Sequence, residues 1–177
     1  MSRYNLILAT LLVAVVVLAR LLPHAPNIAP VAAVAIFAGL YLPKKWGGLV
    51  LLAAMLLSDA VLGFYDWRIM ASVYGSFLIT WLVVAVVIRR EKNIATVAVA
   101  TLGGSLLFFL TTNAAVWAFG TMYPHTLSGL DLSYTMALPF FRNTLIGDVL
   151  YTTVLVGGFE AVSQFFIRRP IARASHH

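Results

Sequence analysis

Long apolar runs, separated by short polar or proline-containing breaks, dominate this chain. A membrane-spanning helix needs about 20 mostly apolar residues, and these runs approach or exceed that length. They predict six spanning helices, at residues 4–22, 28–42, 46–62, 69–88, 94–119 and 143–167. The runs are continuously apolar and lack the alternation of barrel strands, so the sequence predicts an all-α membrane bundle.

Two parts of this pattern are less regular than the rest. The run at 28–42 is the shortest, and residues 120–142 are rich in Pro, Ser, Gly and Asp, which predicts a long loop. The run at 4–22 follows Arg3, as in a signal peptide, but it can span and no small-residue cleavage site follows it, so we expect a retained helix. Residues 1–174 are expected to form one transmembrane domain, and residues 175–177 are interpreted as the start of an expression tag.

The distribution of basic residues predicts the orientation of the bundle. With the N-terminus inside, six spans put nine basic residues in the cytoplasm: Arg3, Lys44, Lys45, Arg89, Arg90, Lys92, Arg168, Arg169 and Arg173. Only Arg20, Arg68 and Arg142 then lie outside. Cytoplasmic loops carry an excess of Lys and Arg, so both ends are predicted to be cytoplasmic. Without the second span, Lys44 and Lys45 would change sides and the bias would weaken.

Composition supports the membrane class and excludes others. Of the 177 residues 62% are hydrophobic and 10% are charged, whereas soluble domains are about 45–50% apolar and about 25% charged. The net charge of +6 resides in short clusters between apolar runs, a pattern typical of contact with anionic lipid headgroups rather than nucleic acid. The chain has no cysteine, which excludes disulfides and thiolate metal sites.

Functional groups concentrate in the loops predicted to face outward and at the adjoining helix ends. They are His24, Asn27, Asp59, Tyr65, Trp67, Arg68, Asn113, Trp117, Tyr123, His125, Tyr134, Arg142, Asn143 and Asp148. Ligand sites are mostly apolar hollows with a few placed polar groups. The asymmetry therefore predicts an outward-facing substrate pocket.

Structural interpretations of the same residues stay open. Aromatic residues at these levels also form the interfacial belt of membrane proteins, and Asn113 could bond a neighbouring helix instead of a ligand. Asp59 and Asp148 lie near helix ends, where each could pair with Arg68 or Arg142 or cap a helix.

Glu160 lies deeper in the sixth predicted helix, about two turns from Arg168. Three interpretations are compatible with its position. It could be a buried structural carboxylate, a protonated carboxyl group or a contact to a partner.

Enzyme motifs are missing from the sequence. The two histidines outside the final pair, His24 and His125, are far apart and belong to no His-x-x-x-His or Glu-x-x-His pattern. There is no nucleophile elbow and no glycine-rich phosphate loop. We therefore expect no catalytic residues, no resident metal or cofactor, and no ATP hydrolysis by this chain alone.

Several stretches together carry a family resemblance. They are residues 21–30 (LLPHAPNIAP), Ser58-Asp59 with Gly63, residues 112–117 (TNAAVW), Tyr123-Pro124, residues 137–144 (ALPFFRNT), and Gly147-Asp148. This pattern resembles small bacterial membrane proteins similar to the S-components of energy-coupling-factor (ECF) transporters. The most similar named group is the BtuM-type solitary cobalamin transporters.

The resemblance implies a function and its partners. S-components are six-helix proteins that capture a vitamin or metal on the outer side, and most dock on an energising module with two ATPases. BtuM-type proteins look able to move cobalamin without a dedicated module. We therefore expect a multi-pass protein of the bacterial cytoplasmic membrane that binds a small organic nutrient, with cobalamin the best single candidate, and releases it inside. The alternatives are a different small substrate or a non-transporting scaffold.

One departure bears on the substrate. BtuM-type members are associated with a cobalt-ligating cysteine, whereas this chain has none, and Thr80 lies in the span where the ligand is expected. His24, His125 and Met70 remain as candidate ligands. Docking on an ECF module is also open, because Thr10 and Ala14 give only a looser version of the Ala-x-x-x-Ala pattern of the first helix.

Overall fold

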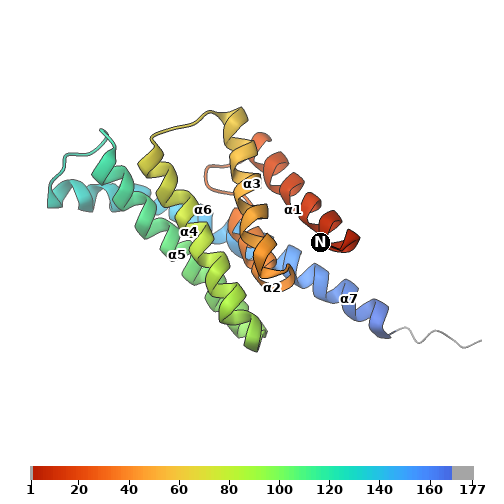
Figure 1. The fold of residues 1–177 in the computed structure, drawn as a ribbon. Helices are drawn as coiled ribbons and strands as arrows, with labels where there is room; N and C mark the ends of the chain where they lie inside the picture. The colour runs from red at the N-terminus through yellow and green to blue at the C-terminus, as the bar shows by residue number, and fades with distance from the viewer. Residues whose placement is uncertain (1, 169–177) are drawn as a thin grey trace, which may run out of the picture.

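A computed structural model describes residues 2–168, and this part of the chain contains helices but no strands. The elements are α1 (Arg3–Leu21), α2 (Val31–Tyr41), α3 (Lys44–Leu62), α4 (Trp67–Val86), the 3₁₀ turn η1 (Ile88–Glu91), α5 (Ile94–Phe119), α6 (Leu127–Thr152), the π-helical turn η2 (Thr153–Gly157) and α7 (Gly158–Arg168) (Figure 1). The expected tag residues 175–177, and Arg169 and Arg173, lie outside the described residues.

Five helical elements are long and apolar enough to cross a membrane. They are α1, α3, α4, α5 and the continuous element α6–η2–α7, which is apolar over Leu127–Phe165. The predicted all-helical class is thus confirmed for the described residues, and the lengths and compositions of these helices are those of membrane spans. The predicted run at 94–119 coincides with α5. The second predicted span, at 28–42, forms only the 11-residue helix α2.

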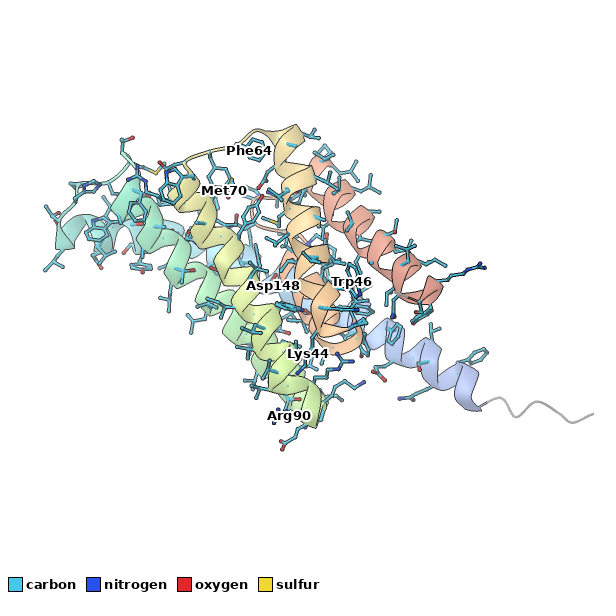
Figure 2. The ribbon with its side chains drawn as sticks, in the orientation of Figure 1. Lys44, Trp46, Phe64, Met70, Arg90 and Asp148 are labelled. Carbon is cyan, nitrogen blue, oxygen red and sulfur yellow. The ribbon has the colours of Figure 1, made fainter. Side chains whose placement is uncertain are left out.

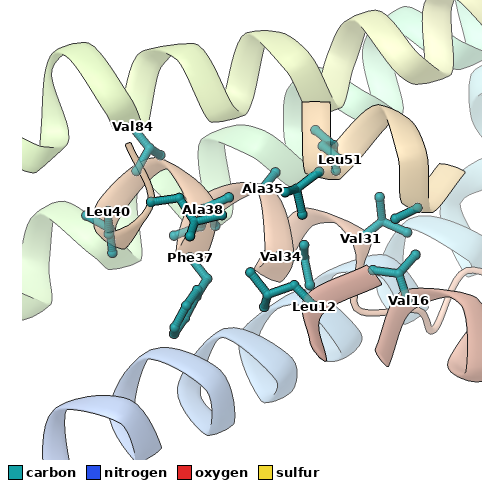
Figure 3. Packing of buried hydrophobic residues seen from close by; sticks show 14 of the residues in the cluster. Leu12, Val16, Val31, Val34, Ala35, Phe37, Ala38, Leu40, Leu51 and Val84 are labelled. Atoms are coloured by element: carbon teal, nitrogen blue, oxygen red, sulfur yellow. The ribbon is translucent and has the colours of Figure 1, made fainter. Parts of the chain in front are cut away.

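The short helix α2 is the core of the bundle. Every residue from Val31 to Leu40 is buried, and α2 packs against α3, α4 and α6. Figure 3 shows α2 side chains among Leu12 and Val16 of α1, Leu51 of α3 and Val84 of α4. A helix that is apolar all round belongs inside a structure. At about 1.5 Å per residue, it is also too short to cross a hydrocarbon core of about 30 Å by itself.

The prediction of a long loop at 120–142 is wrong over most of that range. Only residues 120–126 are a loop, and α6 begins at Leu127. The side chain of Thr126 accepts the Gly129 amide hydrogen and starts the helix, and Pro139 lies inside it. Gly and Pro signal loops in soluble proteins, but helices in membranes tolerate them because neighbouring groups satisfy the backbone. The sixth helix therefore starts 16 residues before the predicted 143–167 run.

The bundle has two different ends. The basic end holds residues 42–45 and 87–93, and the mouth end holds the loops 22–30, 63–66 and 120–126. Figure 2 shows Lys44 and Arg90 at the basic end and Phe64 and Met70 at the mouth end. Helices α1 and α3 run in parallel, because Arg20 near the end of α1 pairs with Asp59 near the end of α3. The structure thus separates most of the described basic residues from the mouth loops.

Glu160 belongs to a contact network at the basic end. Its carboxylate forms an ion pair with Lys92 and accepts a hydrogen bond from the Tyr41 hydroxyl. Arg89 donates to the carbonyl oxygen of Leu42 at 2.8 Å. Glu160 is therefore a structural carboxylate that ties α7 to α2 and to the segment before α5, but it is not buried as one interpretation had it, because its side chain is 35% exposed.

Candidate functional site

Two adjoining cavities lie between the mouth loops and the buried helix α2. The larger has a volume of about 370 Å³ and is lined by Arg20, His24, Asn27, Ala29, Val31, Met55, Leu62, Val73, Phe77, Phe108, Thr144 and Asp148. The smaller, of about 180 Å³, is lined by Asn27, Phe108, Phe109, Thr112, Asn113, Ala137, Phe140, Phe141 and Thr144. The two share Asn27, Phe108 and Thr144. The larger volume falls within the range of about 300–1,000 Å³ typical of small-molecule pockets.

The 22–30 loop forms one wall of both cavities. Its three prolines restrict the backbone between α1 and α2, Pro26 and Asn27 form a turn, and Asn27 adopts a left-handed conformation with φ of 64°. The Asn143 side chain of α6 donates to the carbonyl oxygen of Pro26 at 3.1 Å. Gly147 lies against Ile28, where an added Cβ would approach the Ile28 Cα to 3.3 Å. Helix α6 therefore holds this loop in place over the cavities.

A buried ion pair lies beside the larger cavity. The Arg20 guanidinium pairs with Asp59 at 2.6 Å and donates to the Ser58 hydroxyl. The Tyr74 hydroxyl donates to the other oxygen of Asp59 at 2.6 Å. Asp59 is 1% exposed, so the pair needs these additional hydrogen bonds to offset the cost of desolvation.

Asp59 pairs with neither of the two arginines, Arg68 and Arg142, that the sequence suggested as its partners. The ion pair forms with Arg20, 39 positions earlier in the chain, because α1 and α3 pack side by side in parallel. Arg20 was recognised as a basic residue of the outer side but was not among the candidate site residues. Its place in α1 gave no local sequence signal for a partner in α3.

Asp148 lines the same cavity without a charged partner. It is 3% exposed, and one carboxylate oxygen accepts a hydrogen bond from the Ser105 hydroxyl of α5 at 2.6 Å. Within residues 2–168 it forms no ion pair, either with Arg68 or Arg142 or with another cation. Figure 2 shows Asp148 midway between the two ends of the bundle. Ionisable groups at such depth are costly and tend to be functional.

Aromatic rings supply flat apolar walls. Phe77 of α4 and Phe108 of α5 stack with ring centroids 5.0 Å apart and an interplanar angle of 24°. Phe109 and Phe141 stack at 4.5 Å and 30° beside the smaller cavity. The sequence interpretation did not select these phenylalanines, because apolar residues in a span usually face lipid or the core. Together with the polar groups, they suit a flat organic molecule.

Four of the predicted site residues line the cavities: His24, Asn27, Asn113 and Asp148. One ring nitrogen of His24 lies 2.6 Å from the carbonyl oxygen of Leu22. The Asn113 amide donates to the Phe109 carbonyl oxygen of its own helix at 2.8 Å. Among the described residues, the Asn113 side chain thus forms no hydrogen bond to a neighbouring helix, and only its backbone carbonyl oxygen accepts one, from the Ser133 hydroxyl of α6.

The residues around the 120–126 loop do not line either cavity. The Trp117 indole donates to the carbonyl oxygens of Pro124 and Thr126, at 3.1 and 3.2 Å. His125 contacts the carbonyl oxygen of Gly120 at 3.2 Å, and Tyr123 lies in the same loop. These predicted site residues instead shape the connection between α5 and α6.

The 63–66 loop and the start of α4 also lie outside the cavity linings. Trp67 is 70% exposed, and Arg68 lies over the Phe119 ring at 5.2 Å. Asp66 caps α4, and the hydrogen bond from the Arg68 amide lowers the pKa of its carboxyl group. Burial, followed by the nearby charge of Asp59, raises the pKa of Tyr65.

The remaining candidates lie on α6. The Tyr134 hydroxyl donates to the Leu110 carbonyl oxygen at 2.8 Å, which ties α6 to α5. Asn143 holds the 22–30 loop from outside the linings. Arg142 is exposed and lines neither cavity.

Among the described residues, no group of three or more His, Asp or Glu side chains could hold a metal ion. Of the proposed cobalt ligands, only His24 lines a cavity. Thr80, in the span where the ligand is expected, is buried and donates to the Ser76 carbonyl oxygen. Met70 packs against the apolar core.

A family model matches residues 1–171, so the chain belongs to that family, which is described as a family of unknown function (DUF6580). Neither the curated proteins nor the solved structures contain a match to the chain. The cavities and their side chains therefore carry the functional argument.

Proposed function

We propose that this DUF6580 member is a membrane transport protein that captures a small organic nutrient in the cavity at its mouth end and releases it at its basic end. The observation that carries this proposal is the 370 Å³ cavity, in which Arg20, His24, Asn27 and Asp148 meet in a lining that is otherwise mostly apolar. Ionisable groups within membrane spans are costly to bury and often mark substrate pathways. A few polar groups among aromatic walls are typical of a small-molecule site.

The proposed orientation places the mouth end outside and the basic end in the cytoplasm. Lys44, Lys45, Arg89, Arg90 and Lys92 all lie in the segments of the basic end, and such an excess is typical of cytoplasmic loops. Both chain ends are then inside, because the buried helix α2 returns the chain from the 22–30 loop to residues 42–45 at the basic end, although it is too short to span the membrane alone. In a bacterium this corresponds to a multi-pass protein of the cytoplasmic membrane.

Size narrows the choice of substrate. Cobalamin is the candidate suggested by the resemblance to BtuM-type proteins, and His24 could offer an imidazole to its cobalt. A corrinoid with its nucleotide tail is much larger than a 370 Å³ cavity, so the bundle would have to open and join both cavities to hold it. The site as it stands supports a smaller molecule, of the size of a single- or two-ring vitamin, better than cobalamin.

Release would depend on movement of the bundle or on a partner. The sequence contains no nucleotide-binding motif, so any ATP-driven step comes from a separate module of the ECF type. The lipid-facing side of α1 offers a surface for such a module, because Leu11 and Leu18 are 56% and 59% exposed beside Thr10. Without a module, the protein would equilibrate its substrate across the membrane.

The test is to identify what the protein binds. Detergent-purified protein should release a bound metabolite detectable by mass spectrometry, and should bind a member of a vitamin panel that includes cobalamin. Thr144→Phe should abolish that binding, because Thr144 is 6% exposed and lines both cavities. Ile146→Phe, on the 50%-exposed side of the same helix, is the matched control and should bind normally.

Two results would contradict the proposal. The first is that the purified protein contains and binds no ligand, while cells that carry Thr144→Phe still take up nutrients and grow normally. The second is loss of assembly with another membrane protein in Asn113, Asp59 or Tyr123 variants while uptake is unaffected. The second result would support the non-transporting scaffold instead.

A further inference from the structure

The charge balance of the larger cavity is incomplete. Two carboxylates and one guanidinium belong to it or adjoin it: Asp59, Asp148 and Arg20. Arg20 is already neutralised by Asp59 at 2.6 Å and is further engaged by Ser58. This leaves Asp148 as the one carboxylate of the described cavity lining that has no cation of its own.

The only hydrogen-bond partner of Asp148 within residues 2–168 is Ser105, and that hydroxyl serves two acceptors. It lies 2.6 Å from Asp148 and 3.0 Å from the carbonyl oxygen of Thr101. A hydroxyl has one proton to donate, so it cannot fully satisfy both. The other carboxylate oxygen of Asp148 has no hydrogen-bond partner in this part of the chain. A carboxylate in this state is costly to bury unless a partner arrives.

Resting on the proposed function, we infer that the ligand of this cavity is a small organic cation whose charged nitrogen pairs with Asp148. The nitrogen would donate to the carboxylate oxygen that Ser105 does not contact. The body of the ligand would lie against the stacked rings of Phe77 and Phe108, whose centroids are 5.0 Å apart. Aromatic faces also attract cations, so ring walls and carboxylate favour the same kind of ligand.

A bare metal ion fits the site less well than an organic cation. Hard cations take six or more oxygen ligands, whereas among described residues no cluster of acidic side chains surrounds Asp148. The cavity is also larger than an ion needs, at about 370 Å³. His24, the other titratable group that lines it, is held at the Leu22 carbonyl oxygen and forms no ion pair with Asp148.

The experiment compares three probes with the same ring and different charge at neutral pH: benzylammonium, benzyl alcohol and benzoate. Binding to purified protein is measured by calorimetry, with protein-free micelles as the blank. We expect benzylammonium to bind at least about 10-fold more tightly than benzyl alcohol, since both can donate a hydrogen bond to Asp148 but only the ammonium adds the attraction of opposite charges. Benzoate should bind most weakly.

Variants assign the preference to Asp148. Asp148→Asn keeps the size of the side chain and should remove the preference for the cation. Asp131→Asn, which changes an exposed carboxyl group on the same helix, should keep it, and so should Ser105→Ala, which leaves the Asp148 charge in place. If Asp148→Asn does not fold, the order of the three probe affinities for the unchanged protein still tests whether the cavity prefers a cation.

Different failures have different meanings. Equal binding of the three probes, or an unchanged preference in Asp148→Asn, overturns the cationic ligand. Stabilisation by sodium in place of potassium, lost in Asp148→Asn and without benzylammonium binding, shows a metal-ion site and also overturns it. If a co-purified nutrient is neutral or anionic, the cation inference fails while the proposed transport function stands. If no molecule of any charge binds, both fail.

Discussion

At the residue scale, the polar side chains of the mouth end differ in how completely they are satisfied. Asp59 has an ion pair and a hydroxyl donor, whereas Asp148 has a single shared hydroxyl. Both aspartates are almost fully buried. The partners of Asp59 thus account for its burial, whereas the burial of Asp148 is accounted for only if a ligand pairs with it.

Breaking the Arg20–Asp59 pair should destabilise the bundle strongly. In Arg20→Met the stem still packs, but Asp59 keeps a buried charge without a cation, which costs about 3 kcal/mol. We expect thermal unfolding in detergent to show a large drop in Tm. The double variant Arg20→Met/Asp59→Asn should recover part of it.

Arg68→Met is the matched control, because the Arg68–Asp66 pair is largely exposed. Exposed pairs contribute roughly 0–1 kcal/mol, so its Tm should barely change. An equal loss in Arg68→Met and Arg20→Met would contradict the importance assigned to the buried pair.

The Asp66 cap of α4 should give a pH-dependent contribution to stability. Its folded pKa is lowered, chiefly by the Arg68 amide hydrogen bond. The contribution is therefore present above the ordinary carboxyl pKa of about 4 and is lost as the pH falls through the folded value. The Tm difference between the unchanged protein and Asp66→Ala should be constant near neutral pH and shrink below pH of about 4. A difference that grows on acidification would contradict this sign.

At the scale of elements, the contact between α2 and α4 depends on small residues. A Cβ added to Gly39 would approach the Val84 Cβ to 2.8 Å and the Trp81 carbonyl oxygen to 3.0 Å. These atoms belong to or adjoin the backbone and cannot move without shifting a helix. Close helix packing in membranes relies on such small residues.

Gly39→Ala should therefore lower stability, by roughly 1–3 kcal/mol as in other overpacked cores. Gly103→Ala is the control, because nothing lies within 4 Å of its added Cβ. There the higher helix propensity of alanine, worth about 1 kcal/mol, should leave stability equal or higher. Thermal unfolding of both variants measures the contrast, and a loss in Gly103→Ala equal to that in Gly39→Ala would refute it.

The long element α6–η2–α7 shows why composition misplaced a loop. Ser128, Gly129 and Pro139 are residue types typical of loops. Gly129, however, is required in the first turn of α6, because an added Cβ would come within 1.9 Å of the Pro124 carbonyl oxygen. The proline lies within a helix that packs on α5. From Leu127 to Arg168 the element is about 63 Å long at 1.5 Å per residue. That exceeds a core of about 30 Å, so it must tilt or extend beyond it.

At the scale of the whole molecule, the proposed orientation can be tested by thiol labelling. The chain has no native cysteine, so each introduced cysteine is the only target. Tyr65→Cys and Met122→Cys, at positions 41% and 74% exposed, should react with an impermeant maleimide in intact cells. Lys45→Cys and Arg90→Cys should react only after the membrane is permeabilised. The reverse pattern would invert the proposed direction of transport.

The sequence by itself determined the all-helical class with helices long and apolar enough to cross a membrane, the bounds of most helices within a few residues, and the separation of basic residues from mouth residues. These properties follow from local quantities, namely the length of apolar runs and the position of charges, which act whatever the packing. Asp148 could be selected for the same reason, because a charged group stands out in an apolar run.

Only the tertiary structure decided that the shortest run is the buried core helix, that Asp59 pairs with Arg20, and that Ser105 contacts Asp148. Each of these depends on which helices are neighbours. Arg20 and Asp59 are 39 positions apart, and Ser105 and Asp148 are 43 apart. Such pairings are set by the summed packing of many weak contacts, which no single stretch of the chain specifies.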